Sequence, residues 1–420
     1  MLRTYQQGCV DELEKYWQKT TKPCIIQLAT GGGKSHVIAE IANKADGPVL
    51  VLQPTKEILE QNVEKLLATG YDRRLVSVCS ASAGSWKINM NEKGVTFATI
   101  GTIAKHHERC QHFSTIIIDE VDCVPTERKD SQYMKFLNSL PKHIRIVGFS
   151  ATPWRNVVYA TRFQDPKIFC RPMTRIPCRD GAGTNLGMWV WNKIIYRCGI
   201  ADLQALGYLS KTQYFVAETD WSFVRDVPGR MDYDTTDMMK WVDIEDNTSR
   251  FTQAVKWCMD RNLKVIVFTP NIDMNFRLVR VIEALGGTAE CMDSDNDTKI
   301  SRTNKMKDFR EGKFQFLVNV GMVGRGVDVP SVDAVILCRP TKSLSLYMQF
   351  VGRCLRIDPD NPNKTAYILD LSGNVERFGY VEDVQLVPVQ CTTDSGFNYI
   401  KESIVLKPLN GQRKIFDRVS

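Results

Sequence analysis

A glycine-rich segment near the start of the chain, Ala29-Thr30-Gly31-Gly32-Gly33-Lys34-Ser35, has residue types suited to binding phosphates. Glycines let the backbone wrap a phosphate chain and aim its N–H groups inward at a helix N-terminus. Lys34 would reach the β- and γ-phosphates, and Ser35 would ligate Mg²⁺. The full pattern has a glycine at the position of Leu28. We therefore predict an ATP and Mg²⁺ site here; the alternative is a glycine-rich turn before a core helix. The predicted ligands are Thr30, Gly31, Gly32, Gly33, Lys34 and Ser35.

Acidic residues follow an apolar run further along the chain, where Thr115-Ile116-Ile117-Ile118 leads into Asp119-Glu120-Val121-Asp122. An apolar strand that ends in carboxylates places them at the carboxyl edge of a sheet, where open α/β sheets bind ligands. Asp119 would hold Mg²⁺, and Glu120 would polarise the water that attacks the γ-phosphate. Alone, such a strand end is typical of a solvated turn. Together with the glycine loop it predicts hydrolysis of a nucleotide.

Small hydroxyl residues follow another predicted strand, residues 144–149, in Ser150-Ala151-Thr152-Pro153. Ser150 and Thr152 there could sense the γ-phosphate and pass the change to a neighbouring lobe. The next two residues, Trp154 and Arg155, are candidates to contact nucleic acid.

A set of polar residues in the second half includes two permanent cations: Gln349, Arg353 and Arg356. They are separated by four and three residues, so a helix would place them on one face. Their planar donor groups suit phosphate oxygens. A glycine-rich loop upstream contains Gly326 and Asp328 and suits a cleft between lobes. The alternative is a solvated basic helix face.

Short apolar runs alternate with amphipathic helical patterns, which is typical of α/β architecture with a parallel sheet. Predicted strands cover residues 23–28, 48–52, 75–78, 95–98, 115–118, 144–149, 213–216, 264–268, 314–320, 334–337 and 365–369. Predicted helices cover residues 34–44, 57–67, 249–260, 275–285, 303–310 and 344–355. Residues 165–199 have no clean period and are expected to form a crossover segment. Residues 220–246 also lack periodicity and are expected to form a surface excursion.

The composition fits a globular protein of two or three domains, with 420 residues of which 43% are hydrophobic. The net charge of +7 is compatible with a polyanionic partner but is too small to establish one. No apolar run is long enough for a membrane span, and the first residues have no secretory signal. Thirteen cysteines without paired spacing indicate reduced thiols, so we expect a cytoplasmic location.

The ordered set of motifs resembles the superfamily-two helicases, and the resemblance covers most of the chain. Leu2-Arg3-Thr4-Tyr5-Gln6 matches the family's adenine-reading motif, which implies that Gln6 bonds the adenine edge and Arg3 packs on the ring. The family's strand-tracking motifs, which contact nucleic acid, match Pro54, Thr55, Gln61, Thr99, Gly101 and Thr102.

The resemblance also implies two RecA-like lobes, α/β with mainly parallel sheets and an ATP cleft between them. We expect the first lobe at residues 1–205, including a crossover at 165–205. The second lobe is expected at 206–380 and a C-terminal extension at 381–420. In such an arrangement Arg353 and Arg356 of the second lobe would reach the γ-phosphate of ATP held by the first.

Three segments in the second half resemble RadD-like repair helicases and, more loosely, phage UvsW-type helicases. They are residues 317–321, 339–343 and 370–375. This resemblance implies sequence-independent binding of single-stranded or branched DNA, a bacterial or phage-infected host cell, and replication or recombination proteins as partners. The zinc module of RadD-like proteins is not expected, because the chain ends about fifty residues after Gly373.

Three other functions remain open from the sequence. An RNA helicase would share the same core, because that core grips the nucleic-acid backbone. The motor subunit of a restriction complex would carry the same motifs. A non-enzymatic binding module with a decayed ATP site is disfavoured, because the motif residues Lys34, Ser35, Asp119, Glu120 and Arg353 are all present.

Overall fold

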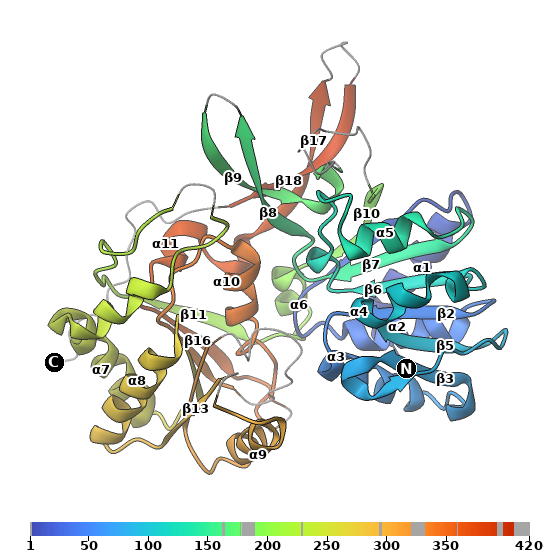
Figure 1. The fold of residues 1–420 in the computed structure, drawn as a ribbon. Helices are drawn as coiled ribbons and strands as arrows, with labels where there is room; N and C mark the ends of the chain where they lie inside the picture. Colours follow the sequence, from blue (N-terminus) through green and yellow to red (C-terminus); the bar gives the residue numbers. More distant parts are fainter. Residues whose placement is uncertain are drawn as a thin grey trace. The chain divides into compact units, whose positions relative to one another are not determined.

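Two compact units make up the chain (Figure 1). The computed structural model describes residues 2–161, 164–176, 178, 190–227, 230–293, 296–320, 332–358, 360–392 and 398–406. The first unit comprises Met1–Val157, Arg171–Gly199 and Leu386–Ile404. The second comprises Val158–Cys170, Ile200–Gln385 and Val405–Ser420. The lobe limits expected from the sequence stay a prediction.

An eight-stranded sheet forms the centre of the first unit, in the order β10-β1-β7-β6-β2-β5-β3-β4. Neighbouring strands pair in parallel except β3 and β4. The strands are β1 (Cys24–Leu28), β2 (Val49–Gln53), β3 (Val76–Ser80), β4 (Ser85–Trp86), β5 (Val95–Thr99), β6 (Thr115–Asp119), β7 (Arg145–Ser150) and β10 (Lys193–Cys198). The helices are α1 (Thr4–Trp17), α2 (Lys34–Lys44), α3 (Lys56–Leu67), α4 (Ile100–Ile103) and α5 (Gln132–Asn138).

The central strands β1, β2 and β6 are buried at every position. Their nearly continuous apolar sequences fit this, because a parallel sheet is covered on both faces. Parallel strands also bring all their carboxyl ends to one edge. The glycine loop follows β1, the acidic residues follow β6 and the Ser-Ala-Thr segment follows β7. Because β1, β7 and β6 are neighbours, the three motifs meet at that edge.

The second unit has a six-stranded, fully parallel sheet in the order β11-β16-β15-β12-β14-β13. Its strands are β11 (Lys211–Val216), β12 (Val265–Phe268), β13 (Ala289–Met292), β14 (Phe316–Asn319), β15 (Ala334–Leu337) and β16 (Thr365–Asp370). Its helices are α6 (Ile200–Ala205), α7 (Glu245–Asp260), α8 (Ile272–Ala284), α9 (Lys299–Arg310), α10 (Leu344–Val351) and α11 (Asn374–Phe378). The predicted α/β class with mainly parallel sheets is confirmed.

Two strand pairs lie outside these sheets, β8 (Trp154–Thr161) with β9 (Gln164–Pro172) and β17 (Gln385–Thr392) with β18 (Asn398–Val405). The crossover expected to be irregular at residues 165–199 therefore contains most of β9 and all of β10. β10 joins the first sheet by pairing in parallel with β1. No helix among the described residues is long and apolar enough to span a membrane.

Residues 220–227 and 230–246 lie mostly at the surface, as expected, but they are anchored to the core of the second unit. Trp241 is fully buried, with 0% exposure, and belongs to the core of the second unit. Its ring stacks on Trp221 with 5.6 Å between centroids and meets Phe251 edge-on at 6.4 Å. Trp241 lies in a 3-10 helix, Thr236–Asp243, whose other buried residue is Met238. These side chains fix the segment to the core.

Replacing Trp241 with Ala should lower the free energy of unfolding of the second unit by about 3–5 kcal/mol, because it leaves a large cavity in the core. Val227→Ala is the matched control in the same segment, since that side chain is 37% exposed. It should change the free energy by no more than about 0.5 kcal/mol. Urea denaturation followed by circular dichroism measures both. Equally small effects would contradict the core position of Trp241.

Candidate nucleotide-binding site

The glycine loop between β1 and α2 has a backbone that only glycine adopts readily. Gly31 has φ of 83° and Gly33 has φ of 77°, both in the left-handed region. A Cβ on Gly33 would lie 2.4 Å from the side-chain nitrogen of Gln6. The loop ends at Lys34, the first residue of α2, so Lys34 and Ser35 occupy the first turn of that helix. A helix N-terminus with free N–H groups is a suitable place for phosphates.

An ion pair joins the glycine loop to the acidic residues. The Nζ atom of Lys34 lies 2.5 Å from Oε1 of Glu120, and the two side chains are 14% and 18% exposed. Burial alone would lower the Lys34 pKa, but the carboxylates of Glu120 and Asp119 outweigh it and leave the pKa raised. Lys34 therefore stays charged, as charge compensation for a phosphate requires.

Glu120 reaches Lys34 from an unusual backbone position. Its φ is 50° and its ψ is 57°, in the left-handed region. Glu120 and Asn262 are the two non-glycine residues with positive φ in the part of the chain that the structure describes. Such a conformation costs of order 1–3 kcal/mol and persists only where the surroundings fix it. Strain of this kind is common where a side chain must be aimed at a site.

Asp119 is the buried carboxylate of the site, with 3% exposure. It accepts hydrogen bonds from the side-chain nitrogen of Asn62 at 3.2 Å and from the backbone N–H of Glu120 at 3.0 Å. Burial raises the pKa of Asp119 to about 6, although the Lys34 ammonium works in the opposite direction. The Lys34 ammonium therefore does not fully offset the cost of burying this carboxylate.

Mg²⁺ fits this environment, because a divalent cation would add the positive charge needed to compensate the buried Asp119 carboxylate. Mg²⁺ commonly binds through one or two carboxylates, keeps several waters and contacts substrate phosphates. The described residues contain no group of three or more His, Cys, Asp or Glu side chains that could hold a metal alone. Asp119 and the Ser35 hydroxyl would supply two protein ligands, a number that suits Mg²⁺ bound mainly by water and phosphate oxygens. The predicted metal ligands stay predictions.

The predicted coupling segment is bonded directly to the acidic residues. The Ser150 hydroxyl donates to Oδ1 of Asp122 at 2.7 Å, and the Thr152 N–H donates to the Ser150 oxygen at 3.0 Å. Ser150 and Thr152 are almost fully buried. A shift of the acidic residues would therefore move the end of β7. This geometry suits the predicted coupling role, which stays a prediction.

The two residues assigned to adenine recognition lie against the glycine loop. The Gln6 amide donates to the Gly32 carbonyl at 3.1 Å and accepts from the Arg3 N–H at 2.9 Å. The Tyr5 hydroxyl also donates to the Gly32 carbonyl, at 3.0 Å. In this structure both ends of the Gln6 amide are bonded within the protein. The predicted contacts of Gln6 and Arg3 with adenine are not tested.

The strand-tracking residues lie at the same sheet edge, after β2 and β5. The Thr55 side chain caps α3 by accepting from the Ile58 N–H at 3.4 Å. The Thr99 hydroxyl donates to Ser80 at 3.1 Å, and the Thr102 oxygen accepts from the Ala81 N–H at 2.9 Å. Partly exposed positions are Pro54, Gln61 and Thr99, and Gly101 is exposed with open space around it.

Trp154 and Arg155 face the protein rather than solvent. Trp154 is 1% exposed. Arg155 forms an ion pair with Glu127 at 3.1 Å and donates to the Val124 carbonyl at 2.9 Å. In this structure neither side chain is available to a nucleic acid, so their predicted contacts find no support in its geometry.

The predicted helical face of Gln349, Arg353 and Arg356 is wrong at its far end. Helix α10 ends at Val351, and Arg353 lies in the turn that follows, where its N–H donates to the Phe350 carbonyl at 3.2 Å. Arg356 lies in an isolated β-bridge with Leu209. A turn at residues 352–354 follows the helix, so the helix ends before Arg356 can join its face.

The roles predicted for these three residues towards ATP stay predictions. Burial lowers the pKa of Arg356, but a guanidinium remains charged. Gln349 and Arg353 are both 7% exposed. The two other predicted nucleotide ligands of this half, Gly326 and Asp328, lie outside the described residues.

Sequence reasoning missed two residues of the site, Tyr5 and Asn62. Tyr5 was quoted within a motif but was given no role. Asn62 lies on the buried face of α3 with Ile58, Leu59 and Val63. An amide on an otherwise apolar helix face is the signal that could have found it, because a buried polar group needs a partner. Its partner is Asp119.

Two family models match the chain. The model described as type III restriction enzyme, res subunit, matches residues 1–155, and the helicase conserved C-terminal domain matches residues 247–358. Residues 1–155 and 247–358 thus match domains of superfamily-two helicases. The resemblance inferred from the motifs is thereby confirmed at this level, while the RadD-like or UvsW-type subgroup stays a prediction.

Curated relatives of this helicase include proteins from yeast, a phage and a filamentous fungus. The putative ATP-dependent helicase IRC3 of Saccharomyces cerevisiae is 24% identical over 395 residues, covering 89% of this chain and 52% of the relative. A 51.5 kDa protein of a Lactococcus phage is 25% identical over 352 residues, covering 82% and 65%. The ATP-dependent RNA helicase FAL1 of Chaetomium globosum is 25% identical over 349 residues, covering 78% and 73%. The chain thus spans about half to two-thirds of the first two relatives.

A solved structure with the same fold is the ATP-dependent Type ISP restriction-modification enzyme LlaBIII bound to DNA. The TM-score is 0.60 at 17% identity, and the match covers 88% of this chain and 27% of the other. At this identity the likeness shows the fold alone. It agrees with the α/β fold of the two units.

Glu120→Gln should retain nucleotide binding and lose turnover by about 10²–10⁴-fold, because the amide keeps the shape but cannot accept a proton. Glu127→Gln is the matched control, since Glu127 also forms an ion pair of low exposure, with Arg155 (15% and 20%). It should keep turnover near the wild-type value. Binding of a fluorescent ATP analogue and steady-state phosphate release measure the two effects. Normal turnover in the Glu120→Gln protein would remove Glu120 from the role of base.

Proposed function

We propose that this superfamily-two helicase is an ATP hydrolase that moves along or unwinds DNA, with branched or forked DNA of recombination, replication or repair as its substrate. The observation that carries the proposal is the Lys34–Glu120 ion pair of 2.5 Å at the glycine loop. It brings a phosphate-binding cation and a catalytic carboxylate to one point. The likeness to helicases, by family model and by relatives, supports the coupling of hydrolysis to nucleic acid.

Hydrolysis needs a cation at the phosphates and a proton acceptor for the attacking water. Lys34 would leave Glu120 for the γ-phosphate when the nucleotide binds. Glu120 would then be free to orient the water and accept its proton. Asp119 and Ser35 would hold Mg²⁺, which when bound neutralises phosphate charge. Ser150 would register the change through its bond to Asp122.

We propose DNA rather than RNA because three segments of the second half resemble RadD-like repair helicases. These are residues 317–321, 339–343 and 370–375. The phage relative fits a bacterial or phage-infected cell, where replication or recombination proteins would be partners. An RNA helicase is the alternative, and the likeness to the RNA helicase FAL1 favours it. A restriction-type motor subunit is a further alternative, favoured by the family model that matches residues 1–155.

ATP hydrolysis on a panel of nucleic acids tests the proposal. The panel contains single-stranded, duplex, forked and four-way DNA, and single-stranded and duplex RNA of matched sequence. We expect forked and four-way DNA to stimulate turnover most and to be unwound. Stimulation by RNA alone would establish the RNA helicase instead. Lys34→Ala, which removes the charge that compensates the γ-phosphate, is the control for contaminating activity.

The affinity for single-stranded DNA should fall linearly with salt on logarithmic axes, by about 0.7 per phosphate contact. The reason is that backbone contacts release counterions, and the strand-tracking residues are of the kind that grip the backbone. Fluorescence anisotropy of a labelled oligonucleotide between 50 and 200 mM salt, a range over which such contacts change affinity by orders of magnitude, measures the slope. Two oligonucleotides of unrelated sequence should give the same slope. A flat response would argue for base-specific recognition.

A further inference from the structure

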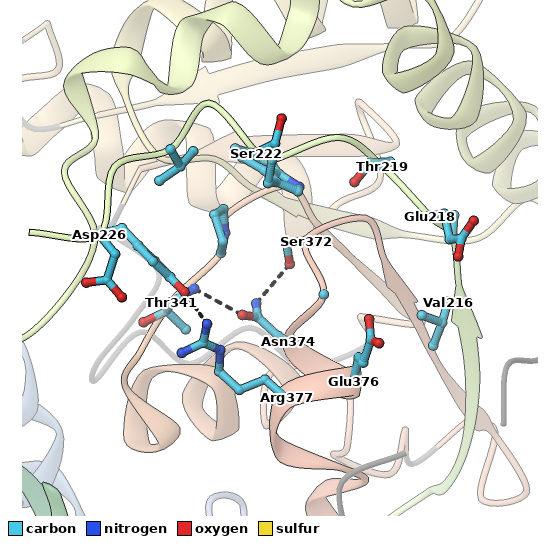
Figure 2. Close-up of a pocket in the computed structure, with 16 residues that line it drawn as sticks. Val216, Glu218, Thr219, Ser222, Asp226, Thr341, Ser372, Asn374, Glu376 and Arg377 are labelled. Atoms are coloured by element: carbon cyan, nitrogen blue, oxygen red, sulfur yellow. Dashed lines mark hydrogen bonds between the residues drawn. The ribbon is translucent and has the colours of Figure 1, made fainter. Parts of the chain in front are cut away.

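An acidic segment of the second unit lies over the carboxyl ends of β15 and β16. It consists of residues 220–227 and 230–243, and is called the acidic strap below. Its aspartates are at 220, 226, 232, 234, 237 and 243, against three basic residues, Arg225, Arg230 and Lys240. Figure 2 shows a pocket between the strap, which carries Ser222 and Asp226, and two other elements: the loop that carries Thr341 and helix α11, which carries Asn374 and Arg377.

Two strap carboxylates bind two cations that follow β15. The Lys342 ammonium is paired with Asp226. The Lys342 N–H donates to Oδ1 of Asp232 at 2.8 Å, and Nη2 of Arg339 lies 3.6 Å from Oδ2 of the same residue. The Thr341 hydroxyl donates to Asp232 as well, at 3.0 Å. The strap therefore holds this loop through charge as well as through hydrogen bonds.

A third cation, Arg377 of α11, contacts the strap through an aromatic ring. Its guanidinium donates to the Tyr233 hydroxyl and lies 5.3 Å from the ring centroid. The Lys342 ammonium lies 5.0 Å from the same centroid. Tyr233 is thus in contact range of two cations at once, an arrangement in which each is attracted to the ring.

The other acids of the strap are engaged away from these cations. Asp234 pairs with Arg230, Asp237 pairs with Arg225, and Asp243 pairs with Arg277 of α8. Asp220 accepts from the Ser222 N–H at 2.8 Å. Asp226 and Asp232 are therefore the acids that the strap directs at the loop after β15.

One of these cations, Arg339, is held incompletely. Its Nε–H is buried and has no acceptor among the described residues. The Arg339 ion pair with Asp232 joins Nη2 to Oδ2 at 3.6 Å, which is longer than a hydrogen bond. The Lys342 side chain is 8% exposed but its partner Asp226 is 69% exposed, so the acid and not the cation is the solvent-facing member. A buried donor without an acceptor costs free energy that a better anion would recover.

Room for such an anion lies beside these residues. The pocket has a volume of about 550 Å³, and its lining includes one cation, Arg377, the ring of Tyr233 and three carboxylates, Glu218, Asp226 and Glu376. It lies at the carboxyl edge of the sheet, where α/β sheets bind ligands. The Asn374 side chain is already used, because it accepts from the Thr341 N–H at 3.0 Å and donates to Ser372 at 2.9 Å. The pocket thus offers one guanidinium and an aromatic ring, and the Lys342 ammonium lies behind its partner Asp226 rather than in the lining.

From these contacts we infer that Arg339, Lys342 and Arg377 form a binding site for the sugar–phosphate backbone of single-stranded nucleic acid. In the empty protein, Asp226 and Asp232 of the acidic strap occupy this site in place of phosphates. This inference rests on the proposed function and adds residues to it. A guanidinium fork matches a phosphate, cations on one loop and on the adjoining helix α11 match a chain of phosphates, and Tyr233 offers a base a surface for stacking.

The strap is then an internal competitor of the strand. Each phosphate that binds must displace a carboxylate, so the strap lowers the affinity of a short or poorly seated strand. It also leaves less counterion release to measure, because the cations are already neutralised by the protein. Removing one strap charge should therefore both tighten binding and steepen its salt dependence.

Asp226→Asn is the test variant, because Asp226 is exposed and its loss leaves the core unchanged. Asp237→Asn is the matched control: it removes the same charge from the same strap, but Asp237 pairs with Arg225 and Lys240 instead. Affinity for a fluorescein-labelled oligodeoxythymidylate is measured by anisotropy on the full chain without nucleotide, over a series of salt concentrations. For Asp226→Asn we expect affinity higher by about threefold to tenfold at low salt and a slope steeper by about 0.7. For Asp237→Asn both values should stay near wild type.

Lys342→Gln provides the second measurement. It should weaken binding, and the Asp226→Asn change should have no effect in its presence, because the cation that Asp226 neutralises is gone. Equal tightening by Asp226→Asn and Asp237→Asn would show a general charge effect and overturn the inference. So would tightening by Asp226→Asn that persists with Lys342→Gln, or an unchanged affinity in Asp226→Asn.

The failure of the proposed function gives a different result. If the wild-type protein hydrolyses ATP and binds the oligonucleotide, and Asp226→Asn behaves identically, the strap inference is wrong and the proposed function stands. If the wild-type protein binds neither DNA nor RNA and hydrolyses no ATP with any member of the nucleic-acid panel, the proposed function is wrong. The inference is then wrong as well, because it rests on that function.

Discussion

The ion pair between Lys34 and Glu120 joins residues 86 positions apart, and it exists because parallel strands end at one edge. β1 positions the glycine loop and β6 positions the acidic residues, with β7 between them in the sheet. Ser150 at the end of β7 then bonds to Asp122 across the same edge. If any of these strands slipped in register, its buried residues would change faces and the pair would be lost together with the core. The site is therefore as stable as the sheet that carries it.

The charge balance of this edge explains its local strain. Asp119 is buried next to Glu120, and two adjacent carboxylates repel each other unless a cation separates them. The left-handed backbone at Glu120 turns its side chain to Lys34, while Asp119 is held by Asn62 and by the Glu120 N–H. One ammonium thus serves two carboxylates, and the pKa of Asp119 remains raised by burial. A nucleotide with its metal ion would bring both the anion for Lys34 and the cation for Asp119.

Most of the fold could be predicted because apolar runs in a parallel sheet are nearly continuous and helices have a period. The glycine loop, Asp119 and Ser150 were found because each directly follows such a run. β10 was missed because Lys193 and Arg197 interrupt its pattern, as suits an edge strand with one neighbour. The surface segment that contains Trp241 was expected, but its anchor was missed because a single buried ring has no period. The position of Arg356 depended on where α10 ends, and helix ends are decided by tertiary contacts that a spacing rule does not include.

In each unit, a lysine that we propose binds phosphate is paired with a carboxylate of the same unit. These pairs are Lys34 with Glu120 in the first unit and Lys342 with Asp226 in the second. This common feature has an energetic reason. An unpaired cation at a low-exposure site would carry a desolvation cost in the empty protein, and a carboxylate partner removes most of it. When a phosphate arrives, one anion replaces another around a cation that is already desolvated and oriented. The exchange costs less than burying a free lysine, and it releases a carboxylate at the moment of binding. In the first unit that carboxylate would be Glu120, which we propose accepts a proton once a phosphate has taken its place beside Lys34.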